Sequence, residues 1–156
     1  MQRSMSLQSC ALALGALLAS SIVAAEGPSP AERAIEYRKA VYTVIGGNFG
    51  PVGAVLQGKA PYNAADVRVR AERVAFMAGL AAEAFPDISK TGDTKAKPEI
   101  WTDPAGFKKA MEALATSTTA LVDLLKTDQT DSAAFKAAAG KVGESCKGCH
   151  DKFKAK

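Results

Sequence analysis

The sequence contains a single histidine, His150, and only three cysteines among its 156 residues. One histidine excludes any site that needs two imidazole ligands. After residue 25 it is joined by only two cysteines, which gives three ligands where a closed structural zinc site takes four. No long alternation of Val, Ile and Thr follows residue 26, so a β-sheet is not indicated. Neither a P-loop nor the glycine fingerprint of dinucleotide-binding proteins is present in the sequence. The informative signals therefore lie in helical patterns and in the few cysteines.

The N-terminal segment has the composition of a secretory signal peptide. It starts with a positive charge at Arg3, continues with an almost wholly apolar stretch over residues 10–23, and ends in the small residues Ala24 and Ala25. A membrane anchor needs about 20 unbroken apolar residues, and this stretch is shorter and interrupted by glycine and serine. We therefore predict that residues 1–25 are cleaved, that the protein is exported to the periplasm, and that no membrane span remains.

The mature chain, residues 26–156, has the length of one domain with one core. It keeps 19 of the 20 Lys and Arg, because Arg3 leaves with the signal, and all 16 Asp and Glu. This balance indicates no basic face for nucleic acid, so no nucleic-acid partner is predicted. Cys10 also leaves with the signal, and the mature chain then has two cysteines, Cys146 and Cys149.

Alanine-rich segments with a helical repeat occupy most of the mature chain, which predicts an all-α fold. The first helix opens at Ser29 with a capping box and a proline, and its glycines together with Pro51 predict a kink or a short break. The other helices are expected to open at Asn63, Asp103 and about Asp131. Four such helices predict an antiparallel, up-down-up-down bundle, with a long loop over residues 86–102.

The segment Cys146-Lys147-Gly148-Cys149-His150 has the C-x-x-C-H pattern of a haem attachment site. Two thiols three positions apart on a helix can each add to a haem vinyl group, and the imidazole of His150 is then offered to the iron. A thioredoxin-like motif would need a βαβ context, which this sequence lacks. The apolar stripe of the last helix passes through both cysteines. We therefore predict one covalent haem c in the core beside the C-terminal helix, with His150 as axial ligand.

The second axial position of the iron separates the functional interpretations. Electron-carrying cytochromes c commonly use methionine there, and Met77 and Met111 are the only methionines after residue 25. Both fit the spacing of ordinary core residues, and the first helix contains no methionine. A five-coordinate iron is the leading interpretation, and a low-spin, six-coordinate electron carrier that uses Met77 or Met111 is the alternative. A peroxidase-like enzyme would lack a distal histidine as acid-base catalyst, so no enzymatic activity is predicted.

Two residues of the first helix are candidates to face the haem. Arg38 lies between Ile35 and Tyr42 on the apolar stripe, where an unpaired charge is costly. A haem propionate would neutralise it, and the alternative is a rotated helix from which Arg38 reaches solvent. Tyr42, one turn further on, would point over the haem face, and its alternative role is that of a simple core aromatic.

The chain resembles cytochrome c′, the high-spin group of class II cytochromes c, over essentially its whole mature length. The resemblance is carried by Glu36-Tyr37-Arg38-Lys39, Asn48-Phe49-Gly50, Ala60-Pro61-Tyr62-Asn63-Ala64-Ala65, Lys97-Pro98-Glu99-Ile100-Trp101 and Val142-Gly143-Glu144-Ser145-Cys146-Lys147-Gly148-Cys149-His150. It implies a haem protein that binds nitric oxide and, more weakly, carbon monoxide. It also implies a homodimer built through the first two helices, with electron transfer to a redox partner protein as a further role.

The resemblance also implies roles for individual residues. Arg38 and Lys39 would lie at the propionates, and Tyr42 would block the distal face. The remaining implied haem contacts are Ile45 and Phe85 in the distal wall, Phe107 near the haem, Thr94 and Lys95 at the haem edge, and Lys154 beside the proximal imidazole.

Overall fold

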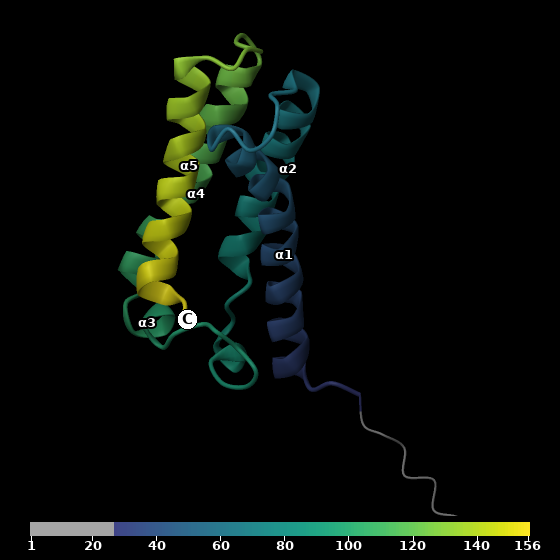
Figure 1. Ribbon diagram of the computed structural model, residues 1–156. Helices are drawn as coiled ribbons and strands as arrows, with labels where there is room; N and C mark the ends of the chain where they lie inside the picture. Colours follow the sequence, from purple (N-terminus) through teal and green to yellow (C-terminus); the bar gives the residue numbers. More distant parts are fainter. Residues whose placement is uncertain (1–26) are drawn as a thin grey trace, which may run out of the picture.

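The computed structural model describes residues 27–156, so the predicted signal peptide lies outside the described residues. The four long helices are α1 (Pro30–Leu56), α2 (Ala64–Glu83), α4 (Pro104–Leu125) and α5 (Ala133–Phe153). Two short helices, η1 (Asp87–Ser89) and α3 (Glu99–Thr102), interrupt the predicted long loop. Figure 1 shows the long helices side by side, with α3 and the C-terminus at the same end of the bundle. The predicted all-α four-helix fold is confirmed.

Each long helix begins after a side chain that accepts a hydrogen bond from the first turn. These capping residues are Ser29, Asn63, Asp103 and Ser132. At Ser29 the bond is reciprocal, because Glu32 also accepts from the Ser29 backbone N–H at 2.7 Å. A cap of this kind typically stabilises a helix by about 1 kcal/mol. The predicted starts are confirmed, with α5 beginning two residues after Asp131.

The predicted break in the first helix is wrong, because α1 is continuous through Pro51. A proline inside a helix removes the hydrogen bond to the carbonyl four residues earlier, which here belongs to Gly47. Arg70 of α2 donates from Nη1 to the Gly47 carbonyl oxygen at 3.3 Å. A side chain of the neighbouring helix thus replaces the missing donor, and α1 continues to Leu56. Gly58, with φ of +67°, follows the helix end in the left-handed conformation that glycine tolerates.

The core lies along the inner stripes of the four helices. α4 packs along both α5 and α2, and α2 also packs along α1, whereas α1 and α5 touch each other much less. Alanines and valines form the buried face of α2, and larger side chains such as Leu121 and Phe135 fill the space between α4 and α5. The weak contact between α1 and α5 leaves room between these helices, and the cavity described below lies there.

The connection between α2 and α4 is tied to the end of α5. The Lys97 N–H donates to the Phe153 carbonyl at 3.0 Å, and the Ala155 N–H donates to the Lys95 carbonyl at 2.8 Å. Trp101 Nε1 donates to the Phe85 carbonyl at 3.1 Å and so anchors the same connection to the end of α2. Loop residues are thereby placed beside the C-x-x-C-H segment.

Among residues 27–156, no helix is long and apolar enough to cross a membrane.

Candidate functional site

A mainly apolar cavity of about 490 Å³ lies between α1, α4 and α5, at the end of the bundle that carries α3. Its volume falls within the range of about 300–1,000 Å³ that is common for ligand sites. The structure brings all the predicted site residues to this one cavity. They are Arg38, Lys39, Tyr42, Ile45, Phe85, Thr94, Lys95, Phe107, Cys146, Cys149, His150 and Lys154.

The C-x-x-C-H residues lie on one face of α5. Cys149 and His150 follow Cys146 by three and four residues, and Phe153 follows them by four and three, which are the steps that align side chains on a helix. All four line the cavity. Neither cysteine forms a disulfide. Burial raises the pKa of both thiols.

His150 is at the exposed edge of this face of α5. Partial burial, followed by the positive charge of Lys154, lowers its pKa below the ordinary value of 6.5. The imidazole is therefore neutral at pH 7, which is the form that ligates a metal. Within residues 27–156, no three His, Cys, Asp or Glu side chains are grouped to hold a bare metal ion.

Arg38 is a buried cation, with only 5% of its surface exposed. The alternative in which its side chain reaches solvent is therefore wrong. Its terminal nitrogens donate four hydrogen bonds, all to uncharged oxygens. The acceptors are the Ala84 carbonyl at 3.1 Å, the Ser89 hydroxyl at 2.7 Å, the Ser89 carbonyl at 3.3 Å and the Thr94 hydroxyl at 2.8 Å. Burial lowers the pKa of this guanidinium, and no carboxylate of the described residues neutralises it.

The cavity fits a haem with ionised propionates. Its walls are apolar, two thiols one helical turn apart open onto it, and an imidazole follows them. Its lining includes the cations Arg38, Lys39, Lys95 and Lys154 but no Asp or Glu. A buried cation without an anionic partner is costly, and a propionate would supply the missing negative charge.

Tyr42 of α1 packs in an aromatic cluster with Phe85, which follows α2, and Phe107 of α4. The ring of Phe85 meets the ring of Tyr42 edge-on at 6.0 Å and that of Phe107 at 4.9 Å. The Tyr42 hydroxyl donates to Met111 Sδ at 3.8 Å. Burial, more than any nearby charge, raises the pKa of Tyr42, so its phenol stays neutral. Tyr42 both packs against the core and lines the cavity.

The two candidate methionine ligands differ in position. Met111, on α4, lines the cavity, whereas Met77, on α2, packs against the core and does not line it. The sequence could not separate them, because both fit a buried helical stripe. Met111 is therefore the only methionine of residues 27–156 that lines the cavity.

Several lining residues were not assigned to the site by the sequence. They are Gly46, Phe49, Gly50, Ala96, Ile100, Ala110, Leu114 and Ser145. Gly46 and Gly50 lie one helical turn apart, on the same side of α1 as Tyr42. Their spacing beside the apolar stripe could have indicated from the sequence that this side of α1 lines a cavity. Ala96 and Ile100 carried no such signal, because their place depends on how the connection folds back onto α5.

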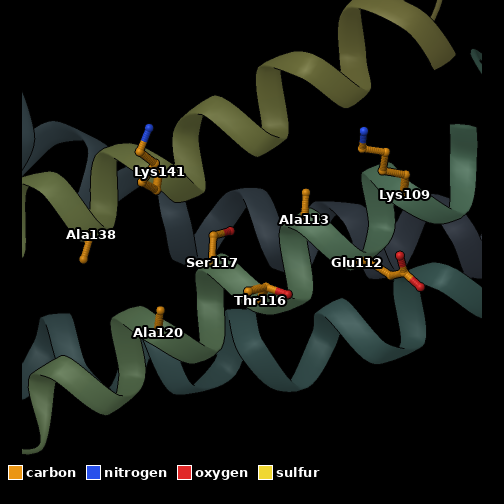
Figure 2. Close-up of a pocket in the computed structure, with 8 residues that line it drawn as sticks. All are labelled: Lys109, Glu112, Ala113, Thr116, Ser117, Ala120, Ala138 and Lys141. Atoms are coloured by element: carbon orange, nitrogen blue, oxygen red, sulfur yellow. The ribbon is translucent and has the colours of Figure 1, made fainter.

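A second hollow lies between α4 and α5 and is shown in Figure 2. Small side chains from both helices line it, together with the longer, charged Lys109, Glu112 and Lys141. It contains no cysteine, histidine or aromatic ring, so it offers neither an attachment point nor an iron ligand. Its Ser117 hydroxyl lies 3.3 Å from the hydroxyl of Ser145, which lines the main cavity.

Comparisons with known proteins agree with this geometry. Residues 33–154 match the family model described as Cytochrome C'. The cytochrome c' of Rubrivivax gelatinosus is 46% identical over 127 residues, which cover 79% of this chain and 95% of that protein. The solved structure of cytochrome c prime from Shewanella frigidimarina is similar with a TM-score of 0.77 and 39% identity, over 83% of this chain and 100% of that one.

Two similar solved structures contain gas ligands. A ferrous variant of cytochrome c prime from Alcaligenes xylosoxidans with bound NO has a TM-score of 0.73 and 34% identity, over 83% of this chain and 99% of that one. A carbon monoxide-bound variant of the same protein has a TM-score of 0.72 and 33% identity, over 82% of this chain and 98% of that one.

Proposed function

This chain belongs to the cytochrome c′ family, and we propose that it is a periplasmic protein whose five-coordinate haem iron binds nitric oxide and, more weakly, carbon monoxide. The cofactor of the family is one covalently attached haem c. When bound, this haem supplies an iron atom whose free coordination position can take a diatomic gas. Periplasmic export is supported by the signal-like residues 1–25.

The observation that carries this proposal is that the cavity offers the iron no evident second ligand. The part of α1 that lines the cavity contains no histidine, and the thioether of Met111 already accepts a hydrogen bond. Tyr42 and Ile45 face the cavity from α1, and Met111 accepts the Tyr42 hydroxyl. Cys146 and Cys149 would hold the haem from α5, and the neutral imidazole of His150 would supply one nitrogen to its iron. No other side chain of the cavity is a free, strong iron ligand.

The same wall accounts for selectivity among ligands. Phe85, Ile45 and the Tyr42 ring crowd the cavity and offer little stabilisation to a charged ligand. A small, uncharged gas that binds iron strongly overcomes this crowding more readily than an anion. Binding of the gas then requires Tyr42 to move.

The alternative function is electron transfer by a low-spin, six-coordinate haem. It is favoured by one observation, namely that Met111 lies in the cavity. The positively charged Lys39, Lys95 and Lys154 beside the cavity would then face a redox partner protein. The visible spectrum of the ferrous protein, with and without carbon monoxide, separates the two functions. We propose no catalytic role, because His150 is the only histidine of the chain and a peroxidase-like mechanism needs a distal acid-base group.

We also propose a homodimer that forms through α1 and α2. Three of the four large apolar side chains exposed in the described part of the chain lie on these helices: Tyr37, Val44 and Phe76. Phe76 is 72% exposed, and exposed apolar side chains that gather on one surface mark sites of protein–protein contact.

The substitution Phe76→Glu tests this interface. A charge at the centre of an apolar contact is strongly unfavourable, so we expect the dimer to dissociate at least tenfold more readily, as measured by sedimentation equilibrium. Ile88→Glu is the control, because Ile88 is also exposed but lies in η1. Equal dissociation constants for the Phe76→Glu variant and the unmodified protein would contradict the proposed interface.

A further inference from the structure

The Tyr42 ring is held at two points. At the ring edge, Phe85 packs against it at 6.0 Å with an interplanar angle of 69°. At the hydroxyl, its hydrogen bond goes to Met111 Sδ at 3.8 Å. Met111 is 6% exposed and belongs to α4, so the contact joins two helices across the cavity.

The Tyr42 hydroxyl bonds Met111 Sδ and makes no hydrogen bond to another side chain of the cavity in the described residues. Arg38 and the lysines are donors only. The Thr94 hydroxyl oxygen already accepts from Arg38 at 2.8 Å and from the Ala96 N–H at 3.0 Å. A thioether is a weak acceptor, yet a weak bond still satisfies a hydroxyl that would otherwise be buried without a partner. The Met111 sulfur is therefore the group that satisfies the phenol in the observed ring position.

We propose that Met111 is a positioning residue that holds Tyr42 in place and thereby sets the barrier to gas binding, an inference that rests on the gas-binding function proposed above. Movement of the ring away from its observed position breaks the hydroxyl-to-sulfur bond. Met111 thus acts through Tyr42 and is not itself an iron ligand. This role differs from that of Leu114, a neighbouring residue of α4 that lines the cavity and offers only packing.

A double-mutant cycle tests the pair. Tyr42→Phe removes only the hydroxyl, and Met111→Leu removes the sulfur while nearly conserving volume. We expect each single variant of the haem-loaded protein to bind carbon monoxide roughly fivefold faster, as measured by flash photolysis, because one weak hydrogen bond no longer opposes ring movement. Met111→Leu should give no further acceleration in the Tyr42→Phe background. An equal acceleration in that background would mean that Met111 acts by packing alone and would overturn the proposal.

A second readout does not depend on gas binding. We expect the urea unfolding of the same four haem-loaded proteins to show a favourable coupling between the hydroxyl and the sulfur, measured as non-additive midpoints. Additive midpoints would contradict the hydrogen bond. If the unmodified protein binds no carbon monoxide but the unfolding midpoints are non-additive, the proposed gas-binding function is wrong. The hydrogen bond between Tyr42 and Met111 is then still supported. If Met111→Leu converts a low-spin resting spectrum to a high-spin one, Met111 is an iron ligand and the positioning role is wrong.

Discussion

Simultaneous replacement of Cys146 and Cys149 by alanine is expected to reduce covalently bound haem from one per chain to none. Both side chains line the cavity from one face of α5, and each can form a thioether bond to a haem vinyl group. Without the thiols, haem is held only by the apolar cavity, by His150 and by the cations near its rim. Acid and organic solvent then extract it, whereas two thioether bonds resist extraction.

Intact mass of the denatured, exported protein is the measurement. The unmodified protein should have the mass of residues 26–156 plus one haem, and this value also tests the predicted cleavage after Ala25. Lys147→Ala is the matched control, because Lys147 lies between the cysteines, is exposed and pairs with Asp151. Haem that stays attached to the double-alanine variant would contradict the assigned attachment site.

Replacement of Tyr42 by alanine is expected to raise the association rate of carbon monoxide by on the order of 10- to 100-fold. The ring contacts Phe85 and Met111, and under the proposed function it is displaced before a gas binds at that side of the haem. Burial of an aromatic side chain is worth roughly 1.5–3 kcal/mol, and each 1.4 kcal/mol of barrier corresponds to about a factor of ten in rate. Removal of the ring therefore removes most of the steric barrier.

Flash photolysis of the carbon monoxide complex measures this rate. Tyr37→Ala is the control, because it makes the same truncation on the same helix at a side chain that is 47% exposed and does not line the cavity. The control should leave the rate near that of the unmodified protein. If Tyr42→Ala leaves the rate unchanged, Tyr42 does not gate the site.

Local signals in the sequence were sufficient for the helix boundaries and for the attachment motif. The capping residues Ser29, Asn63 and Asp103 mark helix starts because each satisfies backbone N–H groups of its own first turn. Cys146 and Cys149 were recognised because their spacing serves one specific chemistry. These features depend on residues that are neighbours in the chain, so they do not require knowledge of the fold.

Features that depend on contacts between distant segments were missed or left open. In α1, which is continuous through Pro51, the Gly47 carbonyl accepts a hydrogen bond from Arg70 of another helix. The burial of Arg38 depends on Ser89 and Thr94, whose positions follow from the path of a long connection. The pattern of polar and apolar residues along the sequence shows the character of each side chain, but it does not show which distant residue that side chain contacts.

The choice between Met77 and Met111 shows the same limit at the candidate site. Both methionines recur at helical spacing, and only the packing of α2 and α4 determines which one faces the cavity. The sequence likewise shows Tyr42 as an apolar-stripe residue but does not show that its hydroxyl meets a sulfur atom of α4.

The visible absorption spectrum of the purified ferrous protein, recorded before and after addition of carbon monoxide, tests the central claim most directly. We expect a broad, unresolved band that sharpens when the gas is added, because the α1 wall of the cavity supplies Tyr42 and not a ligand to the iron. A sharp low-spin band that carbon monoxide does not change would contradict this account, and Met111 would then be the sixth ligand of an electron carrier.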